Sequence, residues 1–198
     1  SRKGEDAGPL ACNRESLAGA VSQRACVYSG ARVVLNPITD ALHLVHGPIG
    51  CASYTWDIRG STSSGPDLYR NSFSTDMKEL DVVFGGEKKL AACLHELAEE
   101  YHPPAIFVYS TCIVGIIGDD LSSVCRKASQ DLGIPVLPVK SEGFRGNKNE
   151  GYKAACNALD SLIGSSDYVP KGPSINMLGE YKVADDLSYV KPFFQELG

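Results

Sequence analysis

The stretch EKKLAACLHELAEEYHPPAIFVYSTC, residues 87–112, decides the fold class. Over residues 87–101 the apolar side chains recur at i, i+3, i+4, i+7, i+8 and i+11, which predicts an amphipathic helix. Pro103 and Pro104 end this helix, and the unbroken apolar run AIFVY over residues 105–109 is typical of a buried parallel strand. A helix followed directly by such a strand indicates an α/β domain.

The same alternation continues after this stretch. A second helix is predicted to begin near Asp119, where acidic side chains suit the helix dipole, and to end at Gly133. Residues 134–139 follow as a strand, and a loop over residues 141–149 leads into a third helix. Alternating strands and helices of this kind favour a Rossmann-like parallel sheet flanked by helices.

The remaining segments set the domain organisation. Residues 1–20 are polar and are predicted to be an N-terminal tail, and residues 21–173 are predicted to form the Rossmann-like domain. Within that domain, residues 32–35 are predicted to be a short strand. Residues 36–85 are rich in Gly, Ser, Thr and Pro, and such a long weakly periodic stretch is uncommon unless it has a function. Residues 174–198 are predicted to be the first strand and helix of a truncated second domain.

Composition limits the classes of function. The net charge of −5 leaves no electrostatic footprint for nucleic acid, and no apolar run approaches the roughly 18 residues of a membrane span. The N-terminal SRKGED is not the start of a signal peptide. Seven cysteines form an odd set without the dense spacing of a disulfide scaffold. We therefore expect a reducing compartment, the cytoplasm, with thiols that are free or metal-bound.

The cysteines divide into two groups. Cys26, Cys51 and Cys112 lie in or beside segments rich in Gly, Ser, Thr and Pro, next to apolar runs. The others are expected on the apolar stripes of helices or in the tail: Cys93, Cys125, Cys156 and Cys12. Iron–sulfur clusters usually take four Cys ligands, so three loop thiolates predict a cluster whose fourth ligand belongs to a second chain. The absence of a CxxC pair argues against a zinc ribbon or a thioredoxin-like site.

Other candidate positions are weaker. The spacing of His43 and His46 permits a metal pair, but histidines bonded to the backbone are favoured. Arg59 is either a surface ion-pair partner or an anion contact. Residues 143–149 (GFRGNKN) form a polar, Gly-hinged loop at the mouth of the sheet, which suits covering a ligand. Residues 84–90 (FGGEKKL) lack the phosphate-loop pattern.

Several segments together resemble the nitrogenase component 1 family, and the likeness extends from about Cys12 to Gly198. They are GAVSQRAC (19–26), HLVHGPIGCASYTWDIRG (43–60), FSTD (73–76), DVVFGGEKKL (81–90) and IIGDD (116–120). The WDIRG and SSGPDL segments, residues 56–60 and 63–68, look like the family's α-like scaffold subunit for maturation of the iron–molybdenum cofactor. They look less like the catalytic α subunit.

The resemblance implies a set of sites and partners. Cys26, Cys51 and Cys112 would ligate a [4Fe–4S] cluster shared with a β-like subunit, NifN, in a heterotetramer. The pocket for the cofactor precursor would be lined by Arg59, Gly143, Phe144, Arg145, Gly146 and Asn149. The fold implied is the first of three family domains, and the thiolate that anchors the precursor belongs to the second. The nucleotide-dependent iron protein and a precursor-donor protein are the other partners implied.

Tyr152 favours a scaffold over an enzyme. The family's catalytic α subunit has a Gly-His pair at the positions of Gly151 and Tyr152, and a phenol with pKa of about 10 donates protons poorly beside an imidazole near 6.5. Three alternatives stay open. They are the catalytic α subunit of a molybdenum or vanadium nitrogenase, a protochlorophyllide reductase that binds a tetrapyrrole, and a cluster-free α/β binding module.

Overall fold

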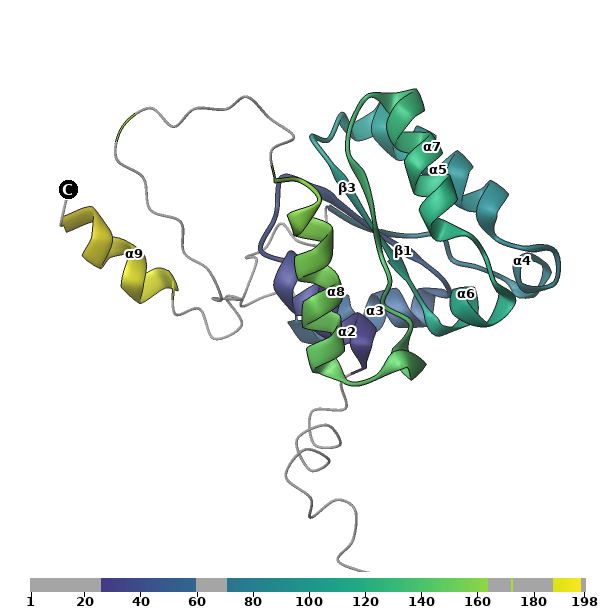
Figure 1. Ribbon diagram of the computed structural model, residues 1–198, viewed down its shortest axis with the longest axis horizontal. Helices are drawn as coiled ribbons and strands as arrows, with labels where there is room; N and C mark the ends of the chain where they lie inside the picture. The colour runs from purple at the N-terminus through teal and green to yellow at the C-terminus, as the bar shows by residue number, and fades with distance from the viewer. Residues whose placement is uncertain (1–25, 60–70, 164–171, 173–186, 197–198) are drawn as a thin grey trace, which may run out of the picture.

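The structure, a computed structural model, describes residues 26–59, 71–163, 172 and 187–196. A four-stranded parallel sheet forms its centre, in the order β2-β1-β3-β4. The strands are β1 (Leu42–His46), β2 (Ser72–Ser74), β3 (Ile106–Ser110) and β4 (Val136–Val139). The predicted α/β class with a parallel sheet is therefore confirmed, and Figure 1 shows the sheet between its helices.

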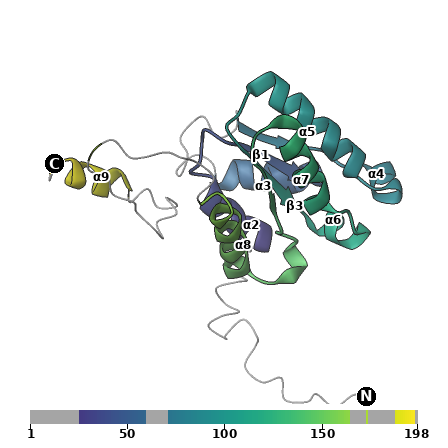
Figure 2. The same ribbon diagram turned by 45° about the horizontal axis from the view of Figure 1, so that its top comes forward.

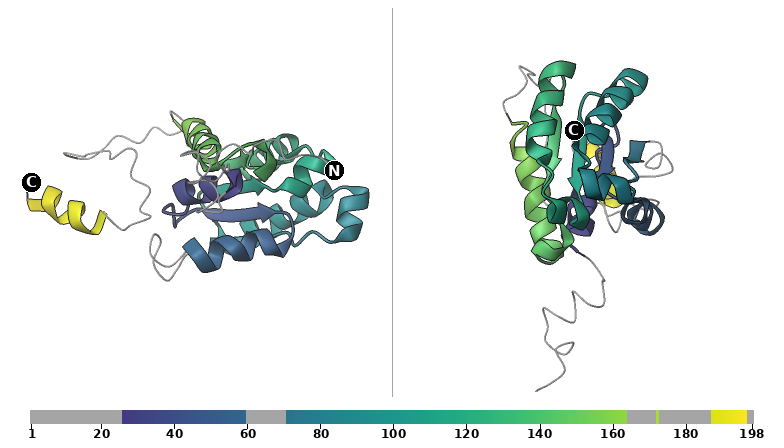
Figure 3. Two further views of the ribbon diagram at one scale, coloured as in Figure 1. Left: turned by 90° about the horizontal axis from the view of Figure 1, so that it is seen from below. Right: turned by 90° about the vertical axis from the view of Figure 1, so that its right-hand side faces the viewer.

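Helices connect and cover the strands. Their bounds are α2 (Val27–Leu35), α3 (Ile49–Arg59), α4 (Glu79–Phe84), α5 (Glu87–Tyr101), α6 (Cys112–Ile117), α7 (Leu121–Leu132), α8 (Lys148–Asp160) and α9 (Leu187–Glu196), with a 3-10 turn at Gly143–Arg145. Helices α5 and α7 pack together, as do α2 and α8 (Figure 2). Helix α3 also contacts β2 and runs beside the sheet (Figure 3).

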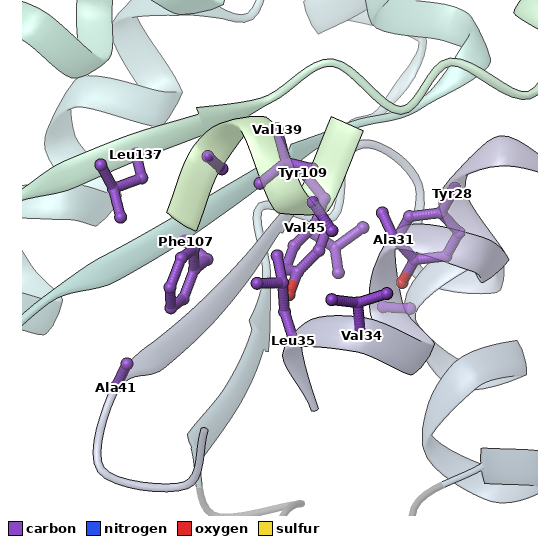
Figure 4. Packing of buried hydrophobic residues seen from close by; sticks show 13 residues of the cluster. Tyr28, Ala31, Val34, Leu35, Ala41, Val45, Phe107, Tyr109, Leu137 and Val139 are labelled. Atoms are coloured by element: carbon purple, nitrogen blue, oxygen red, sulfur yellow. The ribbon is translucent and has the colours of Figure 1, made fainter. Parts of the chain in front are cut away.

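Alternation along the strands divides the core into two layers. Leu44 and Val108 join the cluster under α5 and α7, and Val45, Tyr109 and Val139 join the cluster under α2 and α8. Figure 4 shows this second cluster, with aromatic and branched side chains meeting α2. Because both faces are covered by helices, β3 is buried along its whole length, as its apolar run predicted.

The helix and strand predictions between residues 87 and 160 are confirmed. Helix α5 covers residues 87–101, where the apolar spacing places it, and β3 and β4 lie within the predicted apolar runs. Helix α7 begins after Asp120, whose carboxylate accepts the Ser123 N–H at 2.9 Å, and ends at Gly133 in the left-handed conformation with φ +69°. Local capping chemistry thus agrees with the tertiary fold here.

Before residue 86 one strand prediction is wrong, and the elements within residues 36–85 were not predicted. Residues 32–35 end helix α2 and form no strand. All nine residues of α2 are buried, and a short apolar run cannot by periodicity alone be told from a segment of a buried helix. The weakly periodic stretch 36–85 contains β1, α3, β2 and α4. Strand β1 was missed because its two histidines interrupt the apolar run that a buried parallel strand normally shows.

Two glycines let α2 and α8 approach closely. A Cβ on Gly30 would lie 2.1 Å from the Lys148 carbonyl oxygen, and one on Gly151 would lie 2.0 Å from the Val27 carbonyl oxygen. The contact turns Gly151, Ala155 and Ala158 inward. Cys156 is consequently exposed, which corrects its predicted place in the core; Cys125 is buried as predicted, and Cys93 is half-buried.

Some predictions lie outside the described residues. The tail over residues 1–20 and the strand over residues 175–179 are among them. Helix α9 confirms the helix predicted near the end of the chain, and Pro192 lies inside it. The division into domains stays a prediction. Among the helices of the described residues, none is both long and apolar enough to cross a membrane.

Candidate metal centre

The three loop cysteines lie where a helix begins. Cys26 is the N-cap of α2, Cys51 lies in the first turn of α3, and Cys112 is the first residue of α6. Helices α3 and α6 follow β1 and β3, whose last residues, His46 and Ser110, pair in register. Cys51 and Cys112 therefore lie at one edge of the sheet, the carboxyl edge where α/β folds gather ligands.

Gly143 brings Cys26 and Cys112 together. Its N–H donates to the Cys112 Sγ at 3.1 Å. A Cβ on Gly143 would lie 2.9 Å from that sulfur, 3.2 Å from the Cys26 Cβ and 3.5 Å from the Cys26 Sγ. Gly143 follows β4 in the chain, so segments from three parts of the sequence meet at one point. A hydrogen bond from an amide to a thiolate is the kind of contact that tunes a bound cluster.

The pKa of the Cys51 thiol shows that Cys51 lies near Cys26 and Cys112. Burial raises the pKa of the Cys51 thiol, and the neighbouring Cys112 and Cys26 thiols raise it further. Three thiolates so close repel one another, and a bound cationic iron centre would offset that repulsion. Cys26 and Cys51 are half-buried and Cys112 is exposed, so the group opens on the surface.

Three thiols are the donor type that iron–sulfur clusters take, and such clusters usually have four of them. Within the described part of the chain, no three His, Cys, Asp or Glu side chains lie close enough to hold a single metal ion. The remaining described cysteines lie elsewhere: Cys93 and Cys125 pack in the cluster under α5 and α7, and Cys156 is exposed on α8. Cys12 lies outside the described residues.

Close backbone approach fixes the turn before α3. Thr111, the N-cap of α6, donates its hydroxyl to the His46 carbonyl at 3.0 Å. A Cβ on Gly47 would lie 2.2 Å from the Thr111 Oγ1, so a residue larger than glycine would separate the two segments. Thr111 was not among the predicted site residues; its position directly before Cys112 was the available signal.

His43 has a structural role. Its Nε2 lies 2.8 Å from the Ile38 carbonyl, which can only accept, so Nε2 carries the proton and Nδ1 accepts from the Tyr109 hydroxyl at 2.8 Å. Burial, with the nearby Arg32 charge, lowers the pKa of His43 to about 3. A neutral imidazole with hydrogen bonds at both ring nitrogens has no lone pair left for a metal.

His46 is also held by protein atoms. Its Nδ1 lies 3.0 Å from the Thr75 Oγ1, and its Nε2 lies 3.3 Å from the Asp119 carboxylate. Burial lowers the pKa of His46, and the bond to Asp119 opposes that shift. Asp119 also accepts the Gly86 N–H at 2.9 Å, so this carboxylate joins the end of β1 to the start of α5.

The predicted precursor-pocket residues are only partly gathered. Gly143 adjoins the cysteines, whereas Phe144 is 59% exposed and Arg145 pairs with Glu142. Gly146 precedes α8, and Asn149 donates its N–H to the capping side chain of Asn147 at 2.9 Å. Arg59 is the last residue of α3, and its side chain lies outside the described part of the structure.

Comparison with known proteins agrees with this arrangement. Residues 26–198 match the family described as nitrogenase component 1 type oxidoreductase. The chain is 65% identical over 201 residues to the nitrogenase iron-molybdenum cofactor biosynthesis protein NifE of Methanosarcina barkeri, covering 96% of this chain and 43% of that protein. It is 59% identical to NifE of Clostridium pasteurianum, covering 100% of this chain and 44% of that protein.

Solved structures of the same family are similar to this chain. The fold matches a structure titled "Nitrogenase Cp1 at pH 5" with a TM-score of 0.71 and 37% identity, covering 88% of this chain and 37% of that one. The chain spans less than half the length of the curated relatives it matches. By the residues matched and by its identity to these relatives, the chain belongs to the nitrogenase component 1 type oxidoreductase family.

Proposed function

We propose that this chain is part of an α-like scaffold subunit on which the iron–molybdenum cofactor of nitrogenase is matured. The names of its relatives support this role, because the NifE proteins of two organisms match it at 65% and 59% identity. A scaffold holds a precursor while atoms are inserted and needs no proton donor for substrate reduction. Tyr152, half-buried with the Lys148 ammonium 5.5 Å from its ring centroid, is consistent with that requirement.

Cys26, Cys51 and Cys112 provide three ligands of a [4Fe–4S] cluster in this proposal. The single observation that carries it is the meeting of Cys26 and Cys112 beside Gly143, whose amide donates to the Cys112 sulfur, with the Cys51 thiol close enough for both to raise its pKa. When bound, such a cluster accepts and passes on one electron at a time. The chain's own residues bind it through sulfur, and Gly143 orients Cys112 for that bond.

The fourth thiolate comes from a β-like subunit, NifN, in a heterotetramer. An exposed apolar side chain next to the cysteines supports a covered surface there: Phe144, one residue after Gly143, is 59% exposed. A Cβ on Gly115 would lie 3.0 Å from the Phe144 ring, so this side chain lies against α6.

Two further partners complete the proposal. The nucleotide-dependent iron protein docks on the segment 113–120, which directly follows Cys112, and delivers electrons to the cluster. A donor protein delivers the cofactor precursor to a pocket formed in part by Arg59 and the loop from Gly143 to Asn149. The thiolate that anchors the precursor belongs to a following domain.

Iron analysis of cysteine variants tests the ligand assignment. In the full-length protein co-expressed with its partner, Cys51→Ser should abolish or severely deplete the shared cluster, measured by iron content and by absorbance near 400 nm. Cys93→Ser is the matched control, because Cys93 is half-buried in the cluster under α5 and α7. It should keep its iron and lose about 1–3 kcal/mol of stability from a buried hydroxyl. Equal loss of iron from both variants would remove the assignment.

A further inference from the structure

Arg32 is a fully buried cation on α2. Its side chain is 0% exposed, and its Nη2 donates to the Ser72 Oγ at 3.0 Å. The guanidinium carbon lies 5.0 Å from the centroid of the Tyr109 ring. Among the residues that the structure describes, no carboxylate forms an ion pair with it, and its Nε and Nη1 have no hydrogen-bond acceptor. A buried charge without an anion is costly, so a negative group bound nearby would be stabilised by it.

Tyr28 connects Arg32 with the cysteines. Tyr28 follows Cys26 in the first turn of α2, and its ring meets the Tyr109 ring edge-on, with centroids 5.9 Å apart. Its hydroxyl lies 2.8 Å from the Thr55 Oγ1, one turn of α3 after Cys51. Figure 4 shows Tyr28 on α2 and Tyr109 on the sheet beside it.

Arg32 and Tyr28 meet at the Tyr109 ring, so a single aromatic side chain separates the cation from the residue that follows the start of α2 at Cys26. Arg32 lies about 9 Å further along the axis of α2 than Cys26, at about 1.5 Å per residue. At this depth mobile ions of the solvent screen the charge only weakly.

We infer that Arg32 is the fixed counter-charge of the thiolate-bound cluster and raises its reduction potential. The inference rests on the proposed function, because it needs the cluster at Cys26, Cys51 and Cys112. Each electron that an iron–sulfur reductase delivers adds one negative charge to the cluster, and no bond forms or breaks. A buried cation stabilises the reduced form more than the oxidised form, since net charge is one of the terms that set the potential of a cluster. Arg32 thus acts on the cluster through its charge and not as a ligand of iron.

The test is a redox titration of the full-length complex with dithionite, followed by electron paramagnetic resonance. Arg32→Met and Arg32→Gln remove the charge, and Arg32→Lys keeps it. Coulomb's law, with that rise of about 9 Å taken as the separation and an effective dielectric constant of about 20, predicts a change of about twentyfold in the reduction equilibrium. Twentyfold corresponds to about 80 mV toward lower potential for one electron. Arg126→Met on α7, an exposed position, controls for loss of one charge.

The outcomes separate this inference from the proposed function. Wild-type complex without iron at the cysteines would overturn the proposed function and this inference with it. Normal iron in the two neutral variants with an unchanged potential would overturn the role of Arg32 alone. A lowered potential in both neutral variants, restored in Arg32→Lys and absent in Arg126→Met, would establish it. If one neutral variant fails to fold, the other decides, since Gln keeps a donor for Ser72 and Met keeps the apolar stem.

Discussion

Gly143→Ala should separate cluster binding from folding. The new Cβ would lie 2.9 Å from the Cys112 Sγ, a contact that real Cβ atoms do not make, and 3.2 Å from the Cys26 Cβ. Either the loop or one of the two thiols must move. Movement also lengthens the 3.1 Å hydrogen bond from the Gly143 amide to the sulfur.

The free-energy cost of Gly143→Ala should weaken cluster binding more than it weakens folding. Overpacking by one methyl group costs about 1–3 kcal/mol, and a lost hydrogen bond to a charged sulfur costs about 1.5–3 kcal/mol. Gly143 lies in a three-residue turn with no buried residue, so the loop can shift without disturbing the core. Because the loop can relax, we expect about 1 kcal/mol of this cost to reach the free energy of unfolding, which lowers the melting temperature by about 2–4 °C. Iron content of the purified complex should fall severalfold.

Gly50→Ala is the matched control. Gly50 precedes Cys51 in the first turn of α3, and a Cβ there would meet no atom within 4 Å. Alanine should keep full iron and gain up to about 1 kcal/mol from helix propensity. Iron is measured per complex by colorimetry, and folding by the thermal transition. Full iron in Gly143→Ala, or an equal loss in Gly50→Ala, would refute the close packing of Gly143 against the thiols.

Two further predictions concern docking and pH. Ile116→Asp should weaken binding of the iron protein about tenfold or more, because an apolar contact of about 1.5–3 kcal/mol is lost. Ile163→Asp is the control and should leave binding unchanged, because Ile163 is 79% exposed at the end of α8. Equal affinities of the two variants, measured by titration, would exclude Ile116 from the interface. His43 has its pKa lowered to about 3, so the unfolded chain binds the proton first and stability should fall as pH drops from about 6.5 toward 3. His43→Gln should flatten that part of the urea-midpoint curve, and the exposed His95→Gln should leave it unchanged; identical slopes in all three proteins would exclude His43 as the source.

The structure also changes the choice of docking probe. Asp119 and Asp120 follow α6 and carry charge near Cys112, which makes them attractive positions for charge reversal. Asp119, however, accepts hydrogen bonds from Gly86 and His46, and Asp120 caps α7. Reversing either charge would disturb the fold as well as the surface. Ile116 is the better probe because its side chain is 71% exposed.

The sequence predicted the second half of the sheet well because local and tertiary signals agree there. Helix α5 has a regular apolar stripe and α7 has its own cap, so neither needs distant contacts to be recognised. The first half depends on distant contacts. Strand β1 contains two buried histidines, which are stable only because Tyr109, Ile38, Thr75 and Asp119 satisfy them. No local pattern contains those partners.

The candidate site was predictable in its residue types and not in its geometry. Small residues around Cys26, Cys51 and Cys112 identified these three among seven cysteines. The place of Gly143 depends on β4 lying next to β3, which brings the loop after β4 to the loop after β3. Cys156 shows the converse error: its helix has an apolar stripe, but glycine and alanine on the neighbouring face pack more closely and leave the thiol exposed.

The exposure of the three thiols is itself an argument for a partner. A structural cysteine in a core is buried, as Cys125 is, with burial alone raising its pKa to about 12. The loop cysteines are only half-buried or exposed, yet Gly47, Gly115 and Gly143 all have to be glycine for their segments to pack. The glycines therefore hold the three thiols at a surface that the described residues leave open. This arrangement is what the proposed function requires, because in that proposal a second subunit supplies the fourth ligand from the open side.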